Sequence, residues 1–228
     1  MTDGNQAPEP KVRAAFYIDG FNFYHALDAL GQPHLKWLSY WKLCKNVLPQ
    51  RTQELVGVTW CTARHPSDNS KAIRHDALVL AQKCEGVLVR TGHFVNEDRD
   101  CRGCGNAWKH PSEKEGDINV AINLLRDAFH NVYDHAYLLT ADSDQVATIR
   151  MFKSEFPHKN LTVVVPPGRE RSKHLHAASP NGSIQLNENH IDRAVMRQIV
   201  MKAGVGSVRR PFEYDPPAGW VHPEDRPK

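Results

Sequence analysis

Short β-rich runs alternate with helical segments along most of this chain, and this alternation limits the possible folds more than any other feature. The β-rich runs lie at residues 13–19, 54–62, 86–91, 135–140 and 161–165. The helical segments lie at residues 21–30, 35–48, 67–84, 113–129 and 144–156. Strands that alternate with helices form βαβ units, in which the strands are parallel. The sequence therefore predicts a three-layer α/β fold with a central, mainly parallel sheet.

The helical segment 113–129 carries apolar residues at helical spacing, and we expect this stripe to face the core: Ile118, Ile122, Leu125 and Phe129. Residues 93–112 break the alternation and are expected to form an irregular, cysteine-containing insert. We expect a disordered N-terminal segment at 1–11 and one α/β domain at 12–190. Residues 191–228 are expected to form a C-terminal helix and a proline-rich extended tail.

Composition excludes several classes of protein. The 228 residues carry 29 Lys and Arg against 26 Asp and Glu, so nucleic-acid contacts have to come from local patches and not from bulk charge. No apolar run approaches the length of a membrane span, so we expect no membrane association. Five cysteines are too few for a disulfide scaffold, which favours a cytoplasmic protein. Dinucleotide-binding, P-loop, nucleophile-elbow and zinc-protease motifs are absent from the sequence.

Acidic residues follow two of the expected strands and open one helix. Asp19 ends the first strand, Asp142 and Asp144 follow the strand at 135–140, and Asp117 lies in the first turn of the helix at 113–129. At the carboxyl edge of a parallel sheet these carboxylates can converge. Taken singly, each has a structural explanation as a turn residue, a helix cap or a first-turn acid. Together they favour a site for hard divalent cations that could support phosphodiester hydrolysis.

Three runs resemble one known family: FYIDGFNFYHAL, EKEGDINVAINLLRDAF and YLLTADSDQVATIRMF. They are similar to the NYN-domain family of the PIN-like nuclease superfamily, and the resemblance covers roughly residues 12–190. It implies a Rossmann-like/PIN-like fold and a metal-dependent ribonuclease acting on RNA. The ligands of Mg²⁺ or Mn²⁺ would be Asp19, Asp117, Asp142 and Asp144. Asn22 would orient a ligand or a water molecule, and Glu113 and Lys114 match the family's Glu-Lys pair.

Basic residues give a weaker indication of the partner. Arg169, Arg171 and Lys173 follow the last expected strand, on the side of the acids if the sheet is parallel. Together with Arg64 and Lys114 they are candidates for binding the phosphates of RNA.

The close cysteine pair raises a separate question. Cys101 and Cys104 have the spacing of half a zinc site, with His110, and after it His93, as the nearest further ligands. The alternative is a pair of reduced thiols in a surface loop. The remaining ligands could also come from a second chain, so a homodimer is one expectation.

Two other functions remain open. The domain could bind RNA or a protein without turnover, although that would be expected to remove at least one of the acids. Some relatives of the family are labelled as hydroxylases of pyridine compounds, but the sequence contains no flavin or nicotinamide motif that would support this activity.

Overall fold

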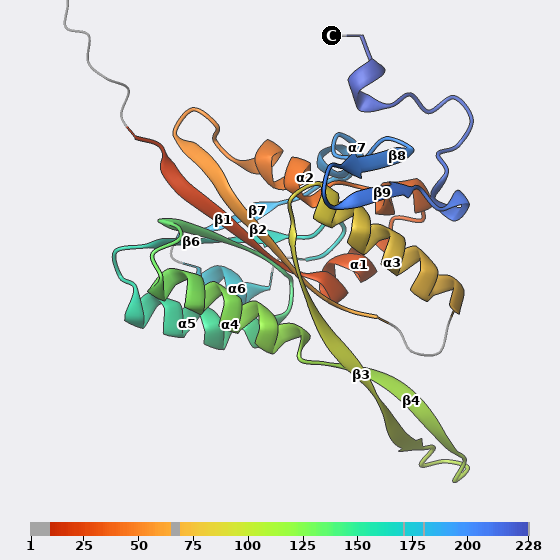
Figure 1. The fold of residues 1–228 in the computed structure, drawn as a ribbon. Coiled ribbons are helices and arrows are strands. Elements are labelled where there is room, and N and C mark those ends of the chain that lie inside the picture. The colour runs from red at the N-terminus through yellow and green to blue at the C-terminus, as the bar shows by residue number, and fades with distance from the viewer. Residues whose placement is uncertain (1–9, 65–68, 171, 180, 228) are drawn as a thin grey trace, which may run out of the picture.

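The structure is a computed structural model that describes residues 10–64, 69–170, 172–179 and 181–227 (Figure 1). Its central sheet has seven strands in the order β4-β3-β2-β1-β5-β6-β7. These strands are β1 (Val12–Asp19), β2 (Gln53–Ala63), β3 (Leu88–Asp100), β4 (Ala107–Lys114), β5 (His135–Leu139), β6 (Asn160–Val165) and β7 (Ser183–Gln185). All neighbouring pairs are parallel except β3 and β4, which run antiparallel. The predicted fold class, a three-layer Rossmann-like/PIN-like α/β fold, is confirmed.

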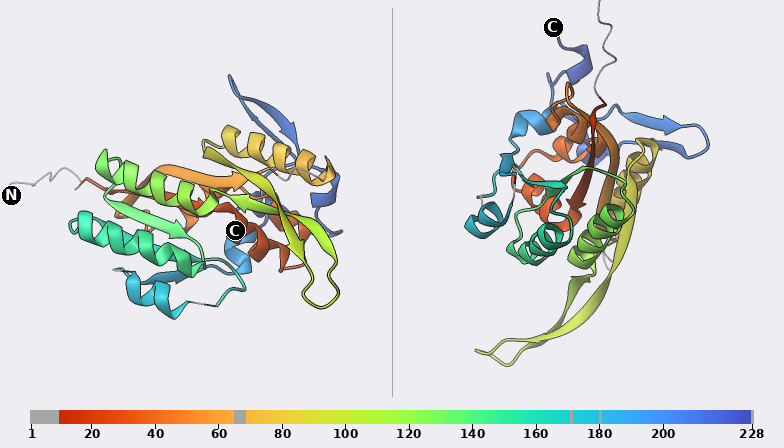
Figure 2. Two further views of the ribbon diagram at one scale, coloured as in Figure 1. Left: turned by 90° about the horizontal axis from the view of Figure 1, so that it is seen from below. Right: turned by 90° about the vertical axis from the view of Figure 1, so that its left-hand side faces the viewer.

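Helices cover both faces of the sheet (Figure 2). The helices are α1 (Gly20–Asp28), α2 (Tyr40–Val47), α3 (Asn69–Cys84), α4 (Gly116–Phe129), α5 (Val146–Glu155), α6 (Lys173–Ala178) and α7 (Glu188–Asp192). Alternate residues of β1 enter different cores: Phe16 and Ile18 pack with α1 to α3, and Ala15 and Tyr17 pack with α4 to α6. This period of two is what a strand covered on both faces requires.

The described residues also form four short 3₁₀ helices: Pro33–Lys36, Ser143–Gln145, Phe212–Tyr214 and Pro223–Asp225. Among the described residues, no helix combines the length and the apolar character needed to cross a membrane.

The prediction of an irregular insert at 93–112 is wrong. The strand expected at 86–91 begins at Leu88 and continues to Asp100, and β4 returns antiparallel beside it. The two strands form a two-stranded arm that projects from the body of the molecule (Figure 1). Gly92 lies at the base of this arm, where a Cβ atom would approach the backbone oxygen of Lys114 to 2.5 Å. A residue without a side chain lets the returning strand come this close.

Two further expectations fail. The stripe predicted to face the core on α4 is largely exposed, because Val120, Leu124 and Ala128 are buried in its place. The C-terminal helix expected within 191–228 does not form: α7 ends at Asp192, and the strands β8 (Ile199–Lys202) and β9 (Gly206–Arg209) pair as a separate hairpin against α3. Most of the segment 1–11 lies outside the described residues.

Candidate active site at the carboxyl edge of the sheet

The strand order reverses at β1. From β1 the chain adds β2 and β3 on one side of the sheet, and it later places β5 and β6 on the other side. The connections therefore diverge between the carboxyl ends of β1 and β5, which is where open α/β sheets bind ligands. Asp19 is the last residue of β1, and Asp142 follows β5 by three residues. The residue after Asp19 has to be small, because a Cβ atom on Gly20 would lie 2.3 Å from the backbone oxygen of Cys61.

Hydrogen bonds fix the ends of β1 and β5 to each other. The Oδ1 atom of Asp19 accepts from the backbone N–H of Asn22 at 3.0 Å, and its Oδ2 atom accepts from the hydroxyl of Thr140 at 2.9 Å. The Thr140 hydroxyl accepts in turn from the N–H of Asp142 at 3.0 Å. Asn22 contributes its side-chain oxygen, which accepts from the N–H of Ala141 at 3.0 Å. Thr140 was missed in the sequence because a threonine at a strand end has no distinctive pattern.

Asp117 reaches the same place from α4. The side chain of Gln145 donates to the backbone oxygen of Asp117 at 3.2 Å and to its carboxylate at 3.4 Å. Gln145 is buried and is itself held by the hydroxyl of Thr148 at 2.9 Å. A buried glutamine therefore connects the first turn of α4 to the turn after β5. The carboxylate of Asp142 caps this turn by accepting from the N–H of Asp144 at 2.9 Å.

The carboxylates of Asp19, Asp117 and Asp142 influence one another. Asp19 is only 4% exposed, and burial raises its pKa to about 6. The hydrogen bonds from Asn22 and Thr140 lower this pKa, and the nearby charges of Asp117 and Asp142 raise it further. The pKa of Asp117 is also raised, first by desolvation and then by Asp142. We call these three residues the acid cluster, and the mutual repulsion of its carboxylates is the kind that a cation relieves.

The acid cluster lines a cavity of about 800 Å³. Asn22 and two of the predicted basic residues, Lys114 and Arg169, lie on its wall, as does Arg99, which the sequence did not single out. Asp144 is exposed and does not line this cavity.

The other predicted phosphate-binding residues lie elsewhere. Arg64 is exposed and pairs with Asp76 of α3 at 3.0 Å, and Lys173 begins α6 without lining the cavity. Arg171 lies outside the described residues. Glu113 belongs to β4, where its backbone pairs with Phe94.

The donor chemistry of the acid cluster fits Mg²⁺ or Mn²⁺, because both prefer carboxylate and amide oxygens. In the described part of the chain, however, no three His, Cys, Asp or Glu residues are already arranged as a cage around an ion. This is compatible with Mg²⁺, which keeps several water ligands and often uses only one or two carboxylates. Asp19, Asp117 and Asp142 are the residues that would hold it.

A second, mainly apolar cavity of about 400 Å³ adjoins the first and shares Phe21, His25 and Phe94 with it. Two buried nitrogen atoms on its lining residues, Nε1 of Trp60 and Nδ1 of His75, have no hydrogen-bond partner among the described residues. An unsatisfied buried donor costs about 1–3 kcal/mol. Both nitrogen atoms are themselves buried, so neither offers an exposed polar contact to the interior of this smaller cavity.

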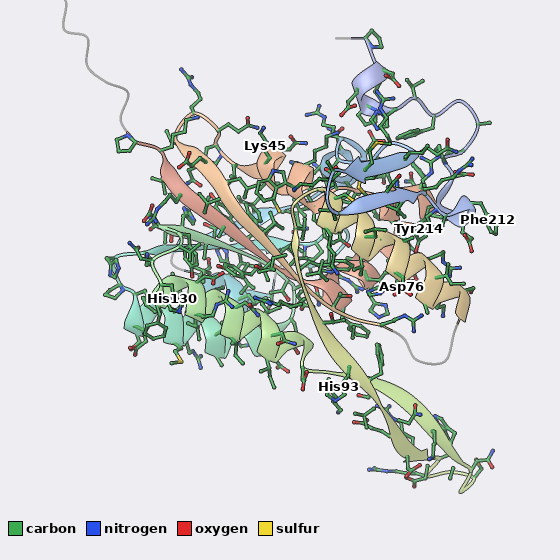
Figure 3. The ribbon with its side chains drawn as sticks, viewed as in Figure 1. Lys45, Asp76, His93, His130, Phe212 and Tyr214 are labelled. Carbon is green, nitrogen blue, oxygen red and sulfur yellow. The ribbon has the colours of Figure 1, made fainter. Side chains whose placement is uncertain are left out.

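The cysteines divide into two groups. Cys61 and Cys84 are buried, as expected for small core residues, and Cys44 is buried as well. Cys101 and Cys104 lie at the tip of the β3–β4 arm. The predicted partnership with His110 is wrong for a single chain, because the backbone of His110 pairs with Glu97, well down the arm. His93 pairs with Lys114 at the base of the arm (Figure 3).

No protein-family model matches the chain. The chain is 27% identical to the 6-hydroxy-3-succinoylpyridine 3-monooxygenase HspA of Pseudomonas putida, over 71% of this chain and 62% of that protein. The matched region thus spans less than two thirds of that relative. Among solved structures, a protein of unknown function from Vibrio parahaemolyticus is similar, with a TM-score of 0.54 and 17% identity. The match covers 81% of this chain and 98% of that one, and it supports the three-layer α/β fold alone.

Proposed function

We propose that the protein is a metal-dependent ribonuclease of the NYN type, which hydrolyses phosphodiester bonds of RNA. The observation that carries the proposal is the acid cluster at the point where the strand order reverses, with Asp19 nearly buried and its pKa raised to about 6. Cationic side chains on the wall of the same cavity support a phosphate-bearing substrate. A bound Mg²⁺ or Mn²⁺ supplies activation of water and stabilisation of charge on the phosphate.

The protein's own residues bind and orient the substrate. Arg169 and Arg99 line the same cavity as the acid cluster, and we expect them to contact phosphate oxygens there. Lys114 is paired with Glu97 at 2.5 Å, so it would exchange this carboxylate for a phosphate when RNA enters. Asn22 holds the turn after β5 through the N–H of Ala141, which fixes where Asp142 stands relative to Asp19.

The test is cleavage of end-labelled single-stranded RNAs with Mn²⁺ or with EDTA. We expect Asp142→Asn to lower the rate by at least about 100-fold. Its melting temperature should stay equal or rise, because asparagine can still cap the turn and one of the repelling charges is lost. Glu155→Gln, at the exposed end of α5, is the matched control and should keep full activity.

Equal activity of Asp142→Asn and the control would show a contaminating nuclease and contradict the proposal. RNA binding without cleavage under either metal would instead favour a non-catalytic binding module. A large loss of stability in Asp142→Asn would assign that residue a structural role.

We also propose a second candidate function, oxidation of a small pyridine compound. It is favoured by the name of the relative from Pseudomonas putida and by the apolar cavity beside the acid cluster. The test is the absorbance spectrum of the purified protein, for a bound flavin, followed by incubation with a hydroxypyridine and NADH. Formation of a hydroxylated product would support this function, and the absence of both chromophore and product would contradict it.

A further inference from the structure

The β3–β4 arm places one cysteine pair far from the rest of the chain. Its ladder runs for eight residue pairs, from His93 and Lys114 at the base to Asp100 and Ala107 at the tip. The views in Figures 1 and 2 agree that the tip extends beyond the body. The arm therefore presents its tip to solvent, and the chain from Cys101 to Asn106 forms the turn there.

The turn brings the two sulfur atoms together. Cys101 donates its N–H to the carbonyl of Asn106 at 2.8 Å and accepts at its own carbonyl from Gly105 at 2.8 Å. Gly105 has a φ of +69°, a backbone conformation that glycine adopts without strain. The N–H groups of Gly103 and Cys104 and the thiol of Cys104 donate to the sulfur of Cys101 and lower the pKa of its thiol. Both sulfurs are accessible, since Cys101 is half-buried and Cys104 is exposed.

Donors aimed at one sulfur favour the thiolate, which is the form that binds metals. A structural zinc site needs four ligands, and this turn supplies two. Among the described residues, no further His, Cys, Asp or Glu joins the pair to make a group of three. The backbone of His110 pairs with Glu97, four residues before Cys101, which is roughly 13 Å along a strand. Ligands of one zinc ion lie within about 4 Å of each other, so the same arm does not complete the site.

We propose that the arm tip is half of a zinc site, which a second copy of this chain completes by placing its own Cys101 and Cys104 around the same ion. The two arms meet tip to tip about a two-fold axis through the ion, so that both copies contribute the same surface. Four S–Zn bonds form and the four thiol protons pass to solvent, with no change of oxidation state. Four thiolates around Zn²⁺ carry two net negative charges, which the Arg102 side chain of each copy offsets. This proposal does not depend on the proposed ribonuclease activity.

The experiment measures zinc content and mass of the full-length protein purified without chelator. We expect one zinc ion per two chains and a particle of twice the 25.8 kDa chain mass in analytical ultracentrifugation. A strong chelator should return it to the monomer, and Co²⁺ in place of zinc should give the absorption spectrum of a tetrahedral tetrathiolate site. Cys104→Ser should abolish both metal and dimer without changing the melting temperature, because the tip lies outside the core.

Cys84→Ala, at a buried cysteine of α3, is the control and should keep zinc and dimer. One zinc per chain in a monomer would overturn the second-copy proposal. A protein without zinc, whose two thiols react freely or join in an intramolecular disulfide, would overturn the metal site as a whole.

Discussion

Asp19 combines a structural and a chemical role in one side chain. Its carboxylate caps α1 through Asn22 and contacts Thr140 at the end of β5, so it holds the two diverging halves of the sheet together. Both hydrogen bonds favour the charged form, yet burial and the neighbouring carboxylates favour the neutral form and dominate. The site is therefore strained electrostatically in the absence of a cation.

This strain predicts an unusual pH dependence of stability. The folded pKa of Asp19 is about 6, above the ordinary value of 3.8, so the folded state binds the proton more tightly than the unfolded state. The metal-free protein should lose stability as the pH rises from about 4 to about 6, by on the order of 2–3 kcal/mol, and change little from this group above that range. Urea unfolding in EDTA at a series of pH values measures this loss.

Asp19→Asn has no such proton to release. The variant should show a flatter stability profile between about pH 4 and pH 6, whereas Glu155→Gln should follow the wild type. Added Mn²⁺ should restore stability to the wild type above pH 6 and have less effect on Asp19→Asn. An unchanged slope in Asp19→Asn would show that Asp19 titrates normally.

At the scale of elements, the sequence correctly predicted the strands whose apolar residues are buried in the core. The strands expected at 13–19, 54–62, 135–140 and 161–165 are present within one or two residues of the expected ends. The arm was missed because the outer part of its strands, NEDRD in β3 and KHPSEK in β4, is mostly polar and lies outside any core, and Pro111 lies within β4. Such strands are stabilised by pairing with each other. This pairing does not require the alternation of apolar and polar residues that a strand packed against a core shows.

The face of α4 was predicted wrongly for a different reason. Two polar residues, Asn123 and Asp127, are buried beside Leu124. Asn123 accepts from Arg90 at 3.0 Å and donates to the carbonyl of Asn119, and Asp127 accepts from the hydroxyl of Tyr17 at 2.8 Å. Specific partners compensate the burial of these polar groups. A prediction made from apolar residues alone places these two polar residues on the solvent side. It therefore assigns the wrong face of α4 to the core.

The observed face of α4 gives opposite predictions for two neighbouring residues. Leu124 is fully buried, so Leu124→Ala should lower the free energy of unfolding by about 2–5 kcal/mol. Ile122 is 56% exposed, so Ile122→Ala should change it by less than about 0.5 kcal/mol. Urea unfolding of both variants measures the difference. A larger loss for Ile122→Ala would mean that this face is covered, either in the chain or by a partner.

At the scale of the whole molecule, the meeting of Asp19, Asp117 and Asp142 at one edge of the sheet could be predicted, whereas the smaller cavity beside them could not. The acids follow strands that the sequence locates, and a parallel sheet then brings the strand ends to one edge. The smaller cavity is closed partly by Tyr214, which reaches α1 and α3 from the C-terminal segment. In Figure 3 this residue lies beside α3, far along the chain from the other lining residues. No local pattern indicates a contact of this kind.

The C-terminal segment is held to the body by several polar contacts. Asp192 of α7 accepts from the indole N–H of Trp220 at 2.9 Å and from the guanidinium of Arg226 at 2.9 Å. Glu213, beside Tyr214, pairs with Arg74 of α3 at 2.8 Å. The buried side chain of Tyr214 contributes apolar contact to the core as well. These contacts connect the last part of the chain to both α7 and α3.

Removal of residues 211–228 should therefore lower the melting temperature by about 5–10 °C, which corresponds to a few kcal/mol for a chain of this size. The loss follows mainly from exposing the core around Tyr214, so Tyr214→Ala should reproduce much of it. The control is Val221→Ala, at an exposed position of the same segment, which should have little effect.

RNA cleavage measured well below the melting temperature should survive the truncation, because the acid cluster makes none of these contacts. Binding of an aromatic compound in the smaller cavity should be lost, because Tyr214 forms part of its wall. An unchanged melting temperature in the truncated protein would mean that the contacts of this segment do not stabilise the domain.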